Sequence, residues 1–172
     1  MKRKITVTVI IIICFLLQCT LFKALAIASI SPNLLIIVTS SFGFMRGKRD
    51  GMFIGLCSGL LMDLFYGDVI GFYALIYMYI GYFNGFFRKI FYPEDIKLPM
   101  ILISASDLFC NLLVYFSMFL FRGRLAFQYY FMHIISPEWV YTIIVTVFLY
   151  FILLMINQKL EKSEKRSTHK IA

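Results

Sequence analysis

The sequence predicts an all-α membrane protein: one integral membrane domain, residues 1–172, built as a bundle of six transmembrane helices. Two observations predict this fold class. The chain is 61% hydrophobic and only 15% charged, whereas soluble domains are about 45–50% apolar and about 25% charged. The apolar residues also fall into separate runs, most of them close to the roughly 20 residues that a helix needs to cross a bilayer.

The first three predicted spans lie between short charged segments. Residues 5–22 form the first apolar run and follow three basic residues. The second run, 32–45, ends against the basic patch 46–49, and the third, 51–66, starts almost at once. Because the second and third runs are short, we expect these helices to be tilted or shielded by their neighbours.

The last three predicted spans are separated by longer connections. They cover residues 71–87, 99–121 and 139–156. Trp139 opens the last span, where an aromatic side chain is expected to anchor the helix at the membrane interface. A basic tail, residues 157–172, follows and is expected to continue as a helix before it frays.

The distribution of lysine and arginine predicts the orientation of the bundle. If the N-terminus is cytoplasmic, the segments on that side are 1–4, 46–50, 88–98 and 157–172, and they hold 14 of the 17 basic residues. Segments on the other side hold three. Cytoplasmic loops carry the excess of basic residues in membrane proteins, so both termini are predicted to be cytoplasmic.

The N-terminal run has a second interpretation. A basic start, an apolar run and the segment Ala24-Leu25-Ala26, which fits a small-residue cleavage site, also resemble a signal peptide. The run is longer than the roughly 7–15 apolar residues of a typical signal peptide, which favours a retained first helix. Cys19 follows Gln18, a poor fit to a lipoprotein box.

The sequence argues against several functions. Its basic residues lie in short clusters without a nucleic-acid motif, and such clusters contact anionic lipids or set topology. None of the four cysteines forms a Cys-x-x-Cys pair, and no phosphate-binding loop, zinc motif or serine-nucleophile motif is present. We therefore expect a non-enzymatic protein without metal or cofactor, with membrane lipids and proteins as partners and no nucleic acid.

One polar residue in the third span stands out. Gly51, Gly55, Gly59 and Asp63 recur every four residues and share one stripe of the helix. Glycines at this spacing allow the backbone of another helix to approach closely. Asp63 is expected to accept hydrogen bonds from amides of the turn 67–71, ending at Gly71, as a structural lock; a proton, ligand or partner contact is the alternative. Three asparagines are other potential partners: Asn33, Asn84 and Asn111.

Polar residues also interrupt the fifth span. Asp107 and Asn111 lie four residues apart, with Ser104 on the same strip. A charged group inside a span costs about 2.5–3.5 kcal/mol or more, so this strip should face the interior of the bundle. A second glycine pair, in the fourth span, predicts another helix-packing face: Gly81 and Gly85, with Asn84 beside them.

The order of these features resembles a known family. Pro32-Asn33-Leu34-Leu35 opens the second span, the glycine stripe ends in Leu61-Met62-Asp63, and the following turn ends in Gly71. Within residues 32–85 this pattern resembles MreD, the rod shape-determining membrane protein family of bacteria. The C-terminal third resembles the family only in its hydropathy.

This resemblance implies a function. MreD-like proteins bind MreC, a single-span protein, and through it act with MreB, RodA and a class B penicillin-binding protein in side-wall peptidoglycan synthesis. The resemblance therefore implies a scaffold subunit of the cell-elongation machinery (the elongasome) in the bacterial inner membrane. The family is similar in fold to the substrate-binding subunits of energy-coupling-factor transporters, which supplies the alternative of a vitamin-binding membrane subunit. Absence of an Ala-x-x-x-Ala stripe from the first span argues against that alternative.

Overall fold

The structure, a computed structural model, describes residues 2–21, 31–67, 69–90, 96–122 and 127–169. Every regular element in these ranges is helical, which confirms the all-α part of the predicted fold class. The elements are α1 (Lys2–Cys19), α3 (Leu34–Arg46), α4 (Lys48–Tyr66), α5 (Phe72–Asn84), the 3-10 helix η1 (Gly85–Ile90), α6 (Lys97–Arg122), α7 (Phe127–Tyr130), the π-helical turn η2 (Phe131–Ile135) and α8 (Ser136–His169).

Helix α3 is the central element of the molecule. All of its residues from Leu34 to Met45 are buried, and it packs against α1, α4, α5, α6 and α8. It begins at Asn33, whose side-chain oxygen accepts a hydrogen bond from the Ile36 amide at 3.3 Å, the usual role of an N-cap residue. It ends at Gly47, whose φ of 100° is favoured only by glycine.

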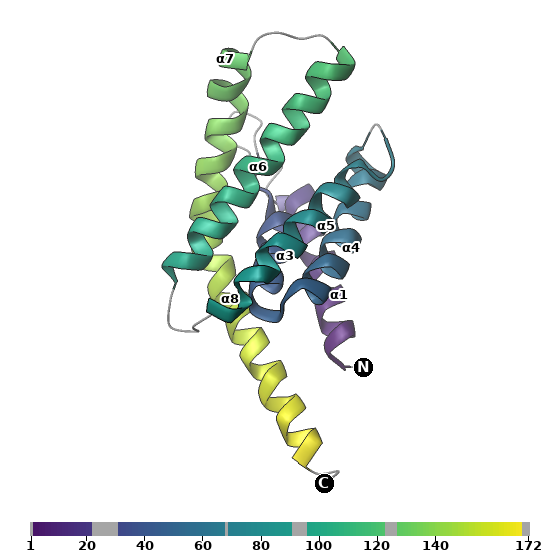
Figure 1. Cartoon of the computed structure of the whole chain (residues 1–172), viewed down its shortest axis with the longest axis vertical. Coiled ribbons are helices and arrows are strands. Elements are labelled where there is room, and N and C mark those ends of the chain that lie inside the picture. The colour runs from purple at the N-terminus through teal and green to yellow at the C-terminus, as the bar shows by residue number, and fades with distance from the viewer. Residues whose placement is uncertain (1, 22–30, 68, 91–95, 123–126, 170–172) are drawn as a thin grey trace.

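Helices α4 and α5 pair more extensively than any other two helices in the described residues. They run antiparallel and lie side by side along their lengths (Figure 1). The turn between them ends at Gly71, which has a φ of 101° and precedes the first residue of α5. This hairpin packs on α3 through both of its helices.

Helices α6 and α8 pack on each other and on α3. They extend beyond the α1–α5 group at one end of the molecule, and α8 also extends beyond it at the other (Figure 1). In the described residues, two helical segments are long and apolar enough to cross a membrane, Lys97–Ser117 and Phe131–Glu164. The sequence predicts six spans, more than these two segments, and that number stays a prediction.

One end of the molecule gathers charged residues from four helices, with basic residues from α1, α3 and α4 and glutamates from α8. Arg3 at the start of α1 pairs with Glu164 near the end of α8 at 2.7 Å. Arg46, at the end of α3, pairs with Glu161 of α8 at 3.5 Å. Lys48 Nζ lies 3.3 Å from the ring centroid of Phe86 in η1. We call this region the basic end; the α4–α5 turn lies at the opposite end (Figure 1).

The distribution of polarity is reversed relative to a soluble protein. Large apolar side chains such as Phe53 and Phe148 are about 70% exposed, while carboxylates such as Asp63 and Asp107 are buried. Soluble monomers rarely expose contiguous apolar patches above a few hundred Å², so an apolar environment is expected around these helices. The segment Ala24–Ala26, on which the signal-peptide interpretation depends, lies outside the described residues.

Candidate functional site

The glycines of α4 face the backbone of α5. A Cβ atom added to Gly51 would lie 2.3 Å from the Gly81 carbonyl oxygen, and one added to Gly55 would lie 2.2 Å from that of Tyr77. At Gly59 the nearest atom would be the Cα of Ala74, at 2.4 Å. No side chain fits at these distances, so α4 and α5 meet backbone to backbone. We call this contact the glycine seam.

Asp63 closes the glycine seam at the start of α5. Its carboxylate is 2% exposed and accepts three backbone hydrogen bonds, from Gly71 at 3.0 Å, Tyr73 at 2.8 Å and Ala74 at 2.9 Å. The first amides of a helix have no partner within the helix, and a carboxylate there also interacts favourably with the helix dipole. Asp63 therefore fixes the N-terminus of α5 onto α4.

The second glycine pair also packs against α4. A Cβ added to Gly81 would lie 2.1 Å from the Gly51 carbonyl oxygen, and one added to Gly85 would lie 2.4 Å from the Lys48 nitrogen. Asn84, beside them, is buried and donates to the Ile80 carbonyl at 2.9 Å and to Ser106 of α6 at 2.8 Å. These residues join α5 and η1 to α4 and α6.

A polar junction connects four helices near the start of α3. The Asn33 side chain accepts a hydrogen bond from the Tyr77 hydroxyl of α5 at 2.9 Å. The Asn33 amide in turn donates to the Thr142 hydroxyl of α8 at 3.3 Å. Pro32 is buried beside Asn33. Thr142 and Tyr77 are completely or almost completely buried, so this junction is closed to the surroundings.

Asp107 of α6 reaches the same junction. Its carboxylate is fully buried, and neither oxygen has a hydrogen bond of ordinary geometry within the described residues. Thr142 and Glu138, both from α8, are its polar neighbours. Asn111, one turn further along α6, is half-buried. Buried polar groups are nearly always hydrogen-bonded in folded proteins, so a buried Asp107 carboxylate without a hydrogen bond among the described residues is unusual.

Trp139 of α8 connects α8 to α6 at Ser104, three residues before Asp107. Its indole nitrogen donates to the side-chain oxygen of Ser104 at 2.8 Å and to the Ser104 carbonyl at 3.1 Å. The sequence predicted an interfacial anchor at this position, and the structure adds a bond between helices. The indole thus bonds to Ser104 but, in the part of the chain that the structure describes, leaves the Asp107 carboxylate without a hydrogen bond of ordinary geometry.

We expect the bonds around Asn33 to be interdependent. Replacing Asn33 with Ala removes the cap of α3 and leaves the Tyr77 hydroxyl without its acceptor, which should cost about 1–3 kcal/mol of unfolding free energy. Tyr77→Phe alone should cost about 1 kcal/mol. Because both variants break the same bond, the double variant should cost less than the sum.

Thermal unfolding in a mild detergent, followed by circular dichroism, measures these differences. Tyr79→Phe is the matched control, since Tyr79 lies on the same helix and is 53% exposed. Strict additivity of Asn33→Ala and Tyr77→Phe would contradict the proposed coupling.

At the basic end, ion pairs connect α1, α3 and the tail of α8. Glu164 accepts from Arg3 at 2.7 Å and lies 3.7 Å from Arg46. Arg3 also donates to the side-chain oxygen of Asn157 at 2.7 Å, and Asn157 donates to Glu161 at 3.3 Å. Asn157 is 1% exposed, so this network anchors the α8 tail to the body of the molecule.

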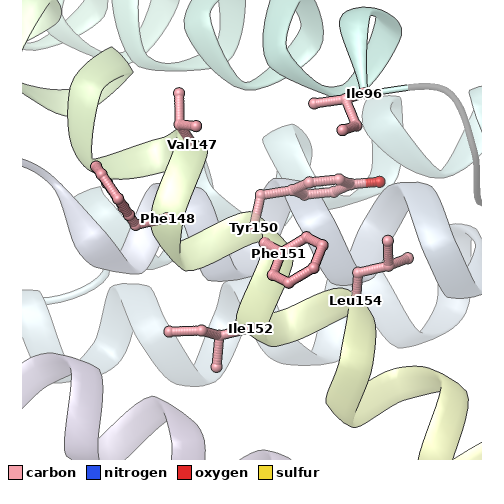
Figure 2. Close-up of a pocket in the computed structure, with 7 residues that line it drawn as sticks. All are labelled: Ile96, Val147, Phe148, Tyr150, Phe151, Ile152 and Leu154. Carbon is pink, nitrogen blue, oxygen red and sulfur yellow. The ribbon is translucent and has the colours of Figure 1, made fainter.

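An apolar groove lies between α8 and the residue before α6. Its volume is about 680 Å³, and Figure 2 shows Ile96 on one side and side chains of α8 on the other. The α8 residues that line it are aliphatic or aromatic: Val147, Phe148, Tyr150, Phe151, Ile152 and Leu154. We call it the α8 groove.

Several of these residues have no counterpart in the sequence prediction. Much of the polar bonding described above is carried by Tyr77, Thr142 and the two arginines of the basic end. Glu138 lies near Asp107. Within the described ranges, no three His, Cys, Asp or Glu residues are grouped so that they hold a metal ion. The four cysteines are free thiols.

Taken together, the apolar exterior and the polar contacts between buried helix faces define a helical membrane protein. The family model of rod shape-determining protein MreD matches residues 1–160, and the chain belongs to the MreD family. The resemblance seen in residues 32–85 is confirmed. No curated protein and no solved structure matches the chain. Membership assigns the protein a structural role in rod shape determination.

Proposed function

We propose that this protein is a non-enzymatic scaffold subunit of the bacterial cell-elongation machinery that binds an MreC-like single-span protein. The match to the MreD family over residues 1–160 carries this proposal. Through that partner it would act with MreB, RodA and a class B penicillin-binding protein in side-wall peptidoglycan synthesis. Rigid pairing of helices by the glycine seam suits a scaffold, because a scaffold must present fixed surfaces to its partners.

We further propose that the chain crosses the inner membrane six times, with both termini in the cytoplasm. The excess of lysine and arginine in alternate connections supports this topology. Arg3, Arg46, Lys48 and the α8 tail lie together at the basic end, as they would if that end were cytoplasmic. Cysteine-accessibility labelling in intact cells tests the topology, and an externally reactive cysteine placed at position 49 would contradict it.

The α8 groove is our candidate for the surface that receives the MreC-like partner. It is long enough along α8, from Val147 to Leu154, to receive about two turns of a transmembrane helix. Without a hydrophobic driving force inside the bilayer, helices associate through close van der Waals packing, and a groove offers more packing than a convex face. The exposed rings of Phe148 and Phe151 would supply most of that contact.

Affinity purification from membranes in mild detergent tests the proposed function. We expect the tagged protein to recover an MreC-like single-span protein. Recovery of ATPase subunits, or of a bound vitamin, would overturn the scaffold and support the energy-coupling-factor alternative.

The same purification tests the α8 groove. Replacing both Phe148 and Phe151 with Ala should lower recovery of the partner at least about tenfold, since loss of two large contacts costs more than 1.4 kcal/mol of binding free energy. Phe116→Ala is the matched control, because Phe116 is 64% exposed on α6 and outside the groove. Equal recovery with the double variant would show that the partner binds elsewhere.

A further inference from the structure

A second open pocket lies at the basic end, bounded by α1, α3 and α4, with the α8 tail at its mouth. Its volume is about 490 Å³. Arg3 and Arg46 lie at one end of it, and the walls beyond them are apolar, with Val7, Ile11, Phe42 and Ile54 among the lining residues. The pocket thus joins the guanidinium groups of Arg3 and Arg46, with Lys4 and Asp50 also in the lining, to a hydrocarbon-like channel.

A carboxylate already occupies the position between the two cations. One oxygen of Glu164 lies 2.7 Å from Arg3 and 3.7 Å from Arg46. Guanidinium groups form strong charge-assisted bonds with phosphate as well as with carboxylate. The position of this oxygen therefore marks where the anionic group of a ligand would bind.

The two arginines are more deeply buried than the carboxylates that pair with them. The side chains of Arg3 and Arg46 are only 14% and 20% exposed, whereas those of Glu164 and Asp50 are 45% and 47% exposed. The cations therefore belong to the wall of the pocket, and the carboxylates reach it from the surface. A ligand can replace an exposed carboxylate without disturbing the packing that holds the arginines.

Burial also removes water from around Arg3. Burial, followed by the charge of Arg46, lowers the pKa of Arg3 below its usual value despite the bond to Glu164. Arginine keeps its proton under all relevant conditions, so Arg3 stays charged in the wall of the pocket and needs an anionic partner.

The apolar part of the pocket runs away from the basic end along α1. Arg3, Val7 and Ile11 are spaced by four residues and share one face of the helix, and all three line the pocket. On the α4 side, Phe53 is 70% exposed and also lines it. A ligand that fits must have an anionic group at one end and an apolar chain about two helical turns long.

We propose that this pocket binds one anionic phospholipid. Its phosphate takes the place of the Glu164 carboxylate between Arg3 and Arg46, and one acyl chain lies along Val7 and Ile11. Basic pockets at the cytoplasmic side of membrane helices suit anionic headgroups. Binding releases Glu164, so the lipid competes with the α8 tail for the same two arginines. This inference involves no protein partner and is independent of the scaffold function.

Native mass spectrometry of the full-length protein in detergent tests the proposal. Dioleoyl phosphatidylglycerol and dioleoyl phosphatidylcholine are added separately at equal concentration. We expect at least a tenfold preference for phosphatidylglycerol, which carries a net negative charge. Arg3→Gln and Arg46→Gln should each abolish that preference. Arg49→Gln, which removes an exposed arginine at the same end outside the pocket, should leave it unchanged.

Glu164→Gln supplies a test that does not depend on loss of structure. Removing the competing carboxylate should raise phosphatidylglycerol binding severalfold. Equal binding of the two lipids, an Arg49→Gln effect as large as that of Arg46→Gln, or weaker binding by Glu164→Gln would each overturn the proposal. Inorganic phosphate that displaces the lipid at equal concentration would show that the acyl channel contributes nothing, and would also overturn it.

Discussion

Replacing Asp63 with Ala should lower the unfolding free energy by at least about 3 kcal/mol. Three backbone amides of the α4–α5 turn and of α5 lose their acceptor, and an unsatisfied backbone group costs several kcal/mol where water cannot reach it. For a chain of this size, that loss corresponds to a fall in Tm of roughly 6–12 °C. Asp63→Asn keeps one acceptor oxygen and should fall between the parent and Asp63→Ala.

Thermal unfolding in mild detergent measures the effect. Asp50→Asn is the matched control, because it changes the same residue type in the first turn of the same helix. Its carboxylate pairs with Arg46 at 3.3 Å but is 47% exposed, so its loss should cost no more than about 1 kcal/mol. If Asp63→Ala melts at the temperature of the parent, the cap does not stabilise the hairpin.

Gly55→Ala should be comparably destabilising, although Ala is the better helix former by about 1 kcal/mol. The added Cβ would lie 2.2 Å from the Tyr77 carbonyl oxygen and 2.6 Å from its carbon. Both are backbone atoms, so no side-chain rotation relieves the overlap and α5 must move away from α4. Overpacking costs about 1–3 kcal/mol or more, and we expect the upper part of that range because the shift also pulls on the Asp63 bonds.

A graded series distinguishes this overlap from a general effect of the substitution. At Gly43 the nearest contact would be 2.7 Å, to the Gly81 carbonyl oxygen, so Gly43→Ala should cost less than Gly55→Ala. Ala105→Val adds two methyl groups at an exposed position of α6 and should be nearly neutral. A stabilising Gly55→Ala would show that helix propensity outweighs the close contact.

The glycine stripe and Asp63 were predictable from spacing, because the helical period places residues four apart on one face. Their partners were only partly predictable. The sequence predicted bonds to Asp63 from amides of the turn ending at Gly71. The structure adds two further donors, the amides of Tyr73 and Ala74. The asparagines offered as other partners bond elsewhere: Asn33 to Tyr77, and Asn84 to Ser106.

The polar face of α8 was missed because hydropathy averages over all faces of a helix. Thr142, Thr146 and Tyr150 follow one another at intervals of four residues, and each is at most 2% exposed. That spacing was a usable signal for an inward-facing stripe. The ion pairs of the basic end could not be predicted in the same way, because counting charges for topology ignores which residues meet across the bundle.

The complete burial of α3 has a consequence for how the chain is made. Two of its neighbours, α6 and α8, follow it in the sequence and are synthesised after it. Thr142, whose hydroxyl accepts from the Asn33 amide, comes 96 residues after Arg46. At translation rates of about 5–20 residues per second, this interval lasts on the order of ten seconds. Until α6 has been made, α3 has only α1, α4, α5 and η1 of this chain as neighbours among the described helices that it contacts in the folded structure. The full set of contacts around α3 therefore forms only after α8 has been made.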